Sequence, residues 1–235
     1  MWCEVFLRLL LAHVIGDFVL QTDGWCGKKL RYGLTSWHIY VHSLIIFLLS
    51  WCVLWSWSAW WIAIVVGGSH LLIDALKRRD GLWPFLWDQA GHIGILVMVG
   101  YSVFKKGLFG ELCWDTYYML CLIVFLLNAK PANILIKLLL GAYSVNVVDN
   151  DEKGEGEARI QSGKLIGNIE RWLIIIFILC EQYEAVGFLI AAKSIIRYKE
   201  GDTQKTEYVL AGTLLSVFIA VISGLVLAFR FSQAN

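Results

Sequence analysis

The sequence predicts an all-α fold, specifically a polytopic integral membrane bundle of about eight transmembrane helices. Three observations support this fold class. Apolar residues make up 58% of the 235 residues and charged residues only 17%, whereas soluble domains carry roughly 25% charged residues. Apolar runs long enough to cross a bilayer, about 17–20 residues, recur along the whole chain. The sequence also contains 12 Trp and 9 Tyr, and these residue types favour membrane–water interfaces.

The expected spans follow from the positions of the apolar runs. They lie near residues 3–20, 37–54, 58–76, 88–104, 113–128, 165–180, 184–198 and 208–230. The first run lacks a basic start and contains His13 and Asp17, so it is expected to be a span and not a secretory signal. The run after Pro131 (ANILIKLLLGAY) is short for a bilayer, and we expect it to lie at the interface or to re-enter.

Basic residues predict which side of the membrane the loops face. The clusters at residues 28–31 and 77–79 place the ends of the first and third spans in the cytosol, because Lys and Arg concentrate in cytosolic loops. Lys105 and Lys106 argue the other way, since the same alternation would put them outside.

All five histidines lie within the first 92 residues, and each stands four residues from another metal-capable side chain. The four pairs are His13/Asp17, His38/His42, His70/Asp74 and Asp88/His92. Residues four apart on a helix lie on the same face, so each pair would offer two ligands, as in metal sites inside helix bundles. Up-and-down connectivity would bring all four pairs to one membrane depth, near the cytosolic side.

This ligand set predicts a divalent transition metal. Imidazole and carboxylate suit Zn, Fe and Mn, and we take Zn as the first choice with Fe and Mn as alternatives. A tetrahedral site uses four ligands, so eight candidates predict one or two ions. A single His/Asp pair on a helix is often only a hydrogen-bonded pair; it is the coincidence of four pairs that favours metal. Asp88 would either bridge two ions or orient a histidine from outside.

Further polar residues near the four pairs are candidates for catalysis and substrate binding. The catalytic candidates are Asp88, Gln21 and Gln89, and the candidates for binding an anionic substrate group are Lys77, Arg78, Lys193 and Arg197. Each has a structural alternative. The glutamines would serve as caps or loop residues, and the basic residues near position 77 as a cytosolic flank. Lys193 and Arg197 would belong, with Arg171 and the acidic residues Glu170 and Glu207, to internal ion pairs that lock helices together.

The chain is expected to divide into three parts. The polar, glycine-containing loop DNDEKGEGE at residues 149–157 is the best candidate boundary. A metal-binding domain of four or five helices would cover residues 1–128, an interfacial helix and acidic loop residues 129–164, and a three-helix membrane domain residues 165–235.

The motifs around the histidines resemble a known family. HVIGDFVLQTD, the His pair that follows it, SHLLIDALK and DQAGH are similar to motifs of the bacterial membrane-protein family catalogued as domain of unknown function 3307, over about residues 5–127. The later segments GNIERW and AAKSIIRY resemble the extension of longer members. The resemblance implies a protein of the bacterial cytoplasmic (inner) membrane and supplies no activity. A looser similarity, confined to H-x3-D helical motifs, exists to membrane-bound metal-dependent hydrolases.

Together these observations predict a membrane-embedded, metal-dependent hydrolase that acts on an amphiphilic phosphate or ester at the cytosolic leaflet. Its partners would be the lipid bilayer and an amphiphilic or lipid substrate, and the net charge of +1 argues against nucleic acid. The alternatives left open are a divalent metal-ion transporter or channel, a metal-stabilised membrane scaffold and a di-iron redox centre. The sequence lacks the Gly-rich phosphate loops and the Ser nucleophile elbow of other hydrolase classes.

Overall fold

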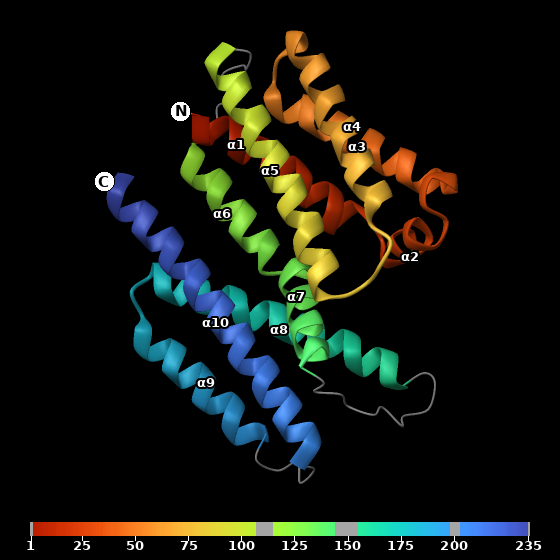
Figure 1. Ribbon diagram of the computed structural model, residues 1–235. Coiled ribbons are helices and arrows are strands. Elements are labelled where there is room, and N and C mark those ends of the chain that lie inside the picture. The colour runs from red at the N-terminus through yellow and green to blue at the C-terminus, as the bar shows by residue number, and fades with distance from the viewer. Residues whose placement is uncertain (1, 107–114, 144–154, 198–202, 235) are drawn as a thin grey trace. The chain divides into compact units, whose positions relative to one another are not determined.

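The computed structural model describes residues 2–106, 115–143, 155–197 and 203–234, and within these ranges the regular structure is helical throughout (Figure 1). The all-α prediction is therefore confirmed. The α-helices are α1 (Trp2–Val14), α2 (Asp23–Tyr32), α3 (Trp37–Leu54), α4 (Trp60–Leu76), α5 (Leu82–Lys106), α6 (Thr116–Leu127), α7 (Lys130–Ala142), α8 (Glu155–Leu179), α9 (Tyr183–Arg197) and α10 (Thr203–Ala234). The chain forms two compact units, Met1–Leu126 and Leu127–Asn235. The division into three domains remains a prediction.

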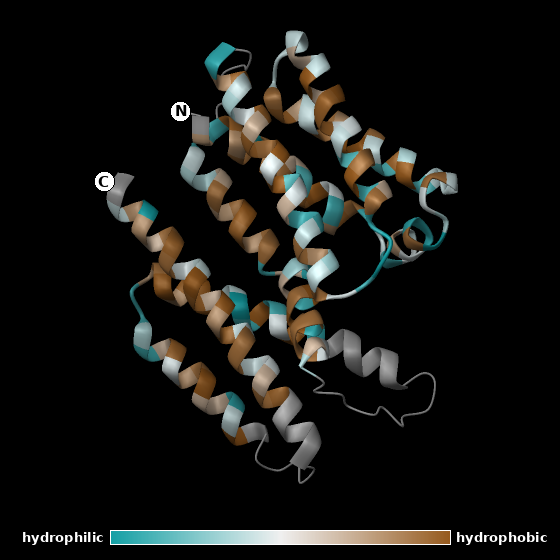
Figure 2. Ribbon diagram, viewed as in Figure 1, coloured by the Kyte–Doolittle hydropathy of each residue, from teal (hydrophilic) through white to brown (hydrophobic). Residues whose placement is uncertain are grey.

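Within the described residues, three helices are long and apolar enough to cross a membrane. They are Trp37–Leu54, Trp57–Leu76 and Val209–Ser232, and α6 with α7 would add a fourth as one broken span. Figure 2 shows that apolar residues predominate along α6 and the central part of α10. In α3 and α4 only 33% of the spanning residues are buried, so most of their apolar side chains are left for a lipid environment. These helices support membrane association, and the count of eight spans stays a prediction.

The first unit is built on four helices that pack in a closed cycle. α1 contacts α3, α3 contacts α4, α4 contacts α5 and α5 returns to α1. Their shared core includes Leu9, Ile46, Ile62 and Leu96, all at most 3% exposed. A helix cycle of this kind has an interior toward which one face of each helix turns, and the histidine pairs lie on these four helices and the turn that follows α1.

Gly67 allows α3 and α4 to approach closely. A Cβ atom at this position would lie 3.0 Å from the Cβ of Phe47 and 3.1 Å from the carbonyl oxygen of Ser43. The Ser43 hydroxyl donates a 2.7 Å hydrogen bond to the Gly67 carbonyl across the same contact. His42 precedes Ser43 and His70 follows Gly67 by three residues, so this close approach sets the separation of the two imidazoles.

The first expected span is not one continuous α-helix. After Val14 the chain continues as a π-helix, η1 (Ile15–Leu20), which contains Asp17. Short π-helical turns are rare and frequently occur at functional sites. The wider turn changes the direction in which Asp17 leaves the helix axis relative to a regular α-helix.

The second unit contains a buried arginine. α8 packs against α10 around Ile174, Ile178 and Ala220. Arg171 of α8 is 1% exposed. Its guanidinium donates hydrogen bonds to the carbonyl oxygens of Asn128 and Ala129, the hydroxyl of Ser216 and the side-chain oxygens of Asn133 and Asn168. Arg171 thus holds the backbone just before α7 to α8 and α10.

Candidate metal centre

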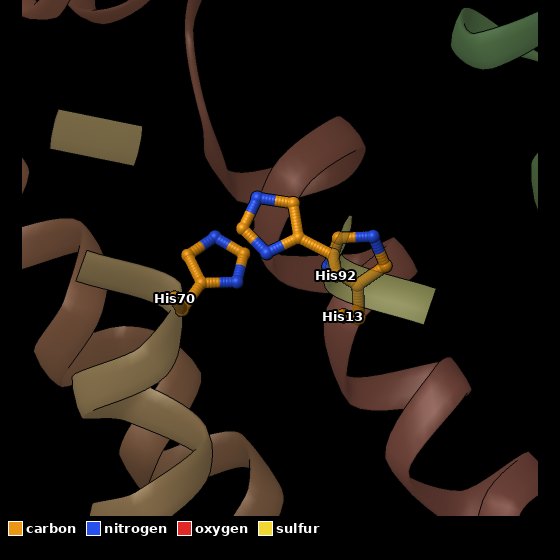
Figure 3. Close-up of side chains that lie close together, drawn as sticks. All are labelled: His13, His70 and His92. Carbon is orange, nitrogen blue, oxygen red and sulfur yellow. The ribbon is translucent and has the colours of Figure 1, made fainter. Parts of the chain in front are cut away.

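Seven of the eight predicted ligands come together in the first unit. They are His13 of α1, Asp17 of η1, His42 of α3, His70 and Asp74 of α4, and Asp88 and His92 of α5. Their nitrogen and oxygen atoms form three overlapping groups, and within each group all atoms lie within 4.8 Å of one another. The four histidines are only 1–3% exposed. Figure 3 shows three of the imidazole rings, from three different helices, gathered at one place.

The tightest group joins Asp17, His42 and His70. The Oδ1 atom of Asp17 lies 3.1 Å from Nε2 of His42 and 3.1 Å from Nε2 of His70. The two Nε2 atoms lie 3.0 Å apart. Ligands of a tetrahedral metal with bonds of 2.0–2.1 Å are separated by about 3.3–3.4 Å. The three atoms are therefore arranged much like ligands around a single ion.

Hydrogen bonds alone satisfy this triangle poorly. A neutral imidazole carries a hydrogen on one ring nitrogen only. If both Nε2 atoms donated to Asp17, their hydrogens would crowd each other across the 3.0 Å gap. If only one donated, the lone pair of the other Nε2 atom would still face the carboxylate at 3.1 Å, and if neither donated, both lone pairs would. A cation between the three atoms removes these conflicts, because all three atoms then direct lone pairs at the same positive charge.

A second group joins Asp74, Asp88 and His92. Nε2 of His92 lies 3.7 Å from Oδ1 of Asp74 and 3.6 Å from Oδ1 of Asp88. Nε2 of His92 and Oδ1 of Asp88 are buried, and neither has a hydrogen-bond partner. Buried polar atoms without partners are uncommon and cost free energy. A cation bound among the three side chains would give both atoms a partner.

His13 lies beside both groups and forms the third group with His70 and His92. Its ring is 5.1 Å from that of His92 and 5.5 Å from that of His70, and the rings of His70 and His92 stack at 3.9 Å. Nδ1 of His13 lies 3.7 Å from Oδ1 of Asp17. His13 is therefore a further ligand candidate for either group.

Gln89 connects the second group to His13. Its Nε2 donates to Oδ2 of Asp88 at 3.3 Å, and its Oε1 lies 3.3 Å from Nε2 of His13. Gln89 thus contacts two of the clustered side chains, and its catalytic role stays a prediction. Gln21, the other glutamine candidate, is buried at the C-terminal end of η1.

Two lysines hold the outer oxygens of the second group. Lys29 of α2 forms an ion pair with Oδ2 of Asp74, and Nζ of Lys77 donates to Oδ2 of Asp88 at 2.9 Å. Each carboxylate thus has Oδ1 near His92 and Oδ2 on an ammonium group. The Lys29 side chain is only 11% exposed. Sequence reasoning placed Lys29 in a basic flank and missed this role, because spacing does not show which lysine of the cluster turns toward the site.

The structure does not bring His38 to the cluster. This predicted ligand belongs to none of the three groups. Its Nδ1 lies 3.2 Å from the Ser36 hydroxyl, and its ring lies 4.3 Å from the ring of Trp37 and 5.6 Å from that of Trp25. His38 is one turn before His42, and a step of four residues moves about 6 Å along a helix axis. The site is at the level of His42, so His38 falls at its edge.

The remaining substrate-binding candidates differ in position. Arg78 is exposed in the connection after α4. Lys193 lies on α9 in the second unit and forms an ion pair with Glu170 of α8, which is the structural alternative expected for it. Arg197 is the last residue of α9, and its side chain lies outside the described residues.

Comparison with known proteins identifies a family. The chain matches the family described as "Protein of unknown function (DUF3307)" over residues 5–139. The matched range contains all seven clustered residues. No curated protein and no solved structure matches the chain. Since more than half of the chain is matched and the motifs around the histidines resemble the same family, the protein belongs to the DUF3307 family.

Proposed function

We propose that the protein is a membrane-embedded, metal-dependent hydrolase whose centre holds divalent transition metal ions. The observation that carries the proposal is the gathering of seven His and Asp side chains into overlapping, buried groups. Imidazole and carboxylate without thiolate suit Zn as the first choice, with Fe and Mn as alternatives. Oδ1 of Asp88 and Nε2 of His92 are buried without hydrogen-bond partners, which favours a bound cation over a cluster held by hydrogen bonds alone.

The ligand geometry favours two ions. Asp17, His42 and His70 would hold one, and Asp74, Asp88 and His92 the other. Each set supplies three protein ligands, the number that leaves a coordination position open in catalytic sites. The two sets adjoin, since Nε2 of His42 lies 3.8 Å from Oδ2 of Asp74. His13 would complete one of the two sets.

Such a centre suits hydrolysis. Paired divalent ions lower the pKa of a bound water and polarise the bond under attack, as in phosphatases and other two-metal hydrolases. The residues of this chain would hold the ions and fix their separation. Gln89 would keep Asp88 and His13 in position, and Lys77 would neutralise part of the carboxylate charge.

The setting favours an amphiphilic substrate. His42, His70 and Asp74 lie on helices that are apolar and long enough to span a membrane, and ionisable groups inside a membrane are expensive unless they serve a function. We place the centre near the cytosolic end of a polytopic bundle of about eight spans in the bacterial inner membrane. The substrate would be a phosphate or ester of a lipid that reaches the centre from the cytosolic leaflet.

Metal analysis of purified protein tests the proposal first. Protein purified in detergent is expected to contain one or two equivalents of metal, and His70→Ala to lose most of it, because His70 belongs to two of the three groups. His38→Ala is the matched control and is expected to keep its metal. Metal-loaded protein is then assayed for release of phosphate or acid from lipid phosphates and esters. Metal binding without turnover of either substrate class would contradict the hydrolase and leave the metal centre standing.

Transport of a divalent cation is the second candidate. It is favoured by one observation, the placement of ligands on two adjacent candidate spans, α3 and α4, which resembles the way transporters build ion sites. A flux assay in proteoliposomes separates the two functions. Metal entry that depends on His70 would support transport, and an enzyme is expected to pass no ion. Loss of folding in His70→Ala, with neither flux nor hydrolysis in the unmodified protein, would favour a metal-stabilised scaffold.

A further inference from the structure

We infer that the group hydrolysed at this centre is a phosphate monoester in its dianionic form, and that Lys29 and Lys77 bind it. The inference rests on the proposed function and narrows its substrate class from phosphates and esters in general. It also assigns a binding role to Lys29, a residue on a surface helix.

Lys29 belongs to α2, a helix at the surface. No residue of α2 is fully buried. Lys28, the preceding residue, is exposed, whereas the Lys29 side chain is 11% exposed and its ammonium group reaches Asp74. An ammonium group brought into a buried site is costly unless it is paired. Helix α2 therefore places one positive charge, the ammonium group of Lys29, at the centre.

The net charge of the centre indicates which kind of substrate group would bind there. Asp17, Asp74 and Asp88 contribute three negative charges, and Lys29 and Lys77 contribute two positive charges. With neutral histidines the residues carry one net negative charge. Two divalent ions would bring the centre to three net positive charges, which is unfavourable in a site shielded from water. A hydroxide nucleophile and a dianion together return the centre to neutrality.

Other substrate classes leave charge uncompensated. A carboxylic ester is neutral and would leave two net positive charges beside the hydroxide. A phosphodiester carries one negative charge and would leave one. Of these three ester classes, the monoester dianion is the one that balances the two-ion centre. The two lysines make this difference, because without them the three carboxylates and the hydroxide alone would neutralise the two ions.

The lysines also lie where an anion could reach them. Each ammonium group has three donors; Lys29 directs one to Oδ2 of Asp74 and Lys77 one to Oδ2 of Asp88. The Lys77 side chain remains 28% exposed. Oδ2 of Asp74, which Lys29 contacts, also lies 3.8 Å from Nε2 of His42, so Lys29 is beside the ligands of the tightest group. Phosphate oxygens bound to the ions could therefore accept hydrogen bonds from the remaining donors of the two lysines.

The reaction balances without another reagent. A water molecule gives up a proton and its oxygen forms a bond to phosphorus. The bond between phosphorus and the alcohol oxygen breaks, and the alcohol oxygen takes up a proton. Phosphate monoester and water thus yield an alcohol and inorganic phosphate.

Binding of inorganic phosphate tests the inference without relying on turnover. Metal-loaded protein in detergent is titrated with phosphate by calorimetry, before and after removal of metal with a chelator. We expect binding only with metal. Lys29→Met is expected to weaken it about ten- to a hundredfold, the effect of one charged hydrogen bond, with unchanged metal content. Lys28→Met is the matched control and keeps the affinity, and Lys29→Arg restores most of it. Lys77→Met provides the same measurement should Lys29→Met fail to fold.

Competition distinguishes the source of the phosphate. Bound phosphate is displaced either with phosphatidate in mixed micelles or with a soluble short-chain phosphate monoester. Stronger displacement by phosphatidate would assign the phosphate group to a lipid substrate, and stronger displacement by the soluble monoester would assign it to a soluble substrate. Either result supports binding of a monoester dianion. The inference is overturned if phosphatidylcholine, a diester, displaces phosphate as strongly as the monoesters do. It is also overturned if the unmodified protein and Lys29→Met bind phosphate with equal affinity. If the purified protein contains no metal, the proposed function is overturned together with this inference. If metal-loaded protein binds no phosphate, this inference alone is overturned.

Discussion

The Nε2 atoms of His42 and His70 lie 3.0 Å apart, although 27 residues separate the two histidines in the sequence. Their helices cross at Gly67 and Ser43, where the backbone of α4 comes within reach of a side chain on α3. The meeting point of two candidate spans is thus also the meeting point of two ligands. The packing of α3 on α4 and the assembly of the centre are expected to respond together to substitution.

Substitution of Gly67 tests this coupling. Gly67→Ala places a Cβ atom 3.0 Å from the Cβ of Phe47 and 3.1 Å from the Ser43 carbonyl, so Phe47 and the backbone at Ser43 must give way by a few tenths of an ångström. We expect a loss of about 1–3 kcal/mol in stability and a lower metal content. Gly68→Ala is the matched control, since a Cβ there meets nothing within 4 Å. Thermal unfolding in detergent and elemental analysis give the two readouts. Equal behaviour of the two variants would show that close helix packing does not set the site.

Metal is expected to stabilise the first unit. A ligand that binds only the folded state raises stability by mass action, by about 2.7 kcal/mol at a hundred times its dissociation constant. Chelation should therefore lower the unfolding temperature of the unmodified protein and of His38→Ala. It should lower that of Asp17→Asn by less, because this variant has already lost a ligand of the tightest group and keeps only the second set. A chelator effect of the same size in all three proteins would place the metal elsewhere.

Acidification should release the metal. Imidazole and carboxylate ligands bind a cation only in their deprotonated forms, so protons compete with metal. The difference in unfolding temperature between metal-loaded and chelated protein is expected to be largest above about pH 7 and to vanish near about pH 5, where free imidazole is protonated. Measuring both forms across this range isolates the metal-dependent part. A difference that persists at the acidic end would argue against histidine ligands.

Arg171 is expected to be essential to the fold of the second unit. Its replacement by Met removes hydrogen bonds to five oxygen atoms and leaves buried acceptors without donors. We expect destabilisation of about 3 kcal/mol or more. Arg230→Met, at an exposed position of α10, is the control and should change stability little. Unfolding followed by a probe in α9 or α10 reports on this unit. A small effect of Arg171→Met would mean that water replaces the guanidinium.

The local part of the site was accessible from the sequence, and the tertiary part was not. Pairs such as His70/Asp74 and Asp88/His92 could be recognised because their spacing of four residues is a property of one helix. The ion pair of Lys29 with Asp74 depends on how α2 folds back over the bundle, for which the basic cluster gives no signal. His38 shares the spacing of four residues with the clustered pairs. Its exclusion depends on the level at which the helices cross, which Gly67 sets from another part of the chain.

The π-helical turn of η1 makes the site depend on chain length as well as residue type. Asp17 is directed at His42 and His70 from within this widened turn. Deletion of one residue between His13 and Asp17 would favour a regular helix and rotate the carboxylate by about 100° around the axis. Such a shortened chain would keep every ligand and still lack the tightest group. Insertions and deletions in residues 14–20 are therefore expected to harm the site more than most conservative substitutions there.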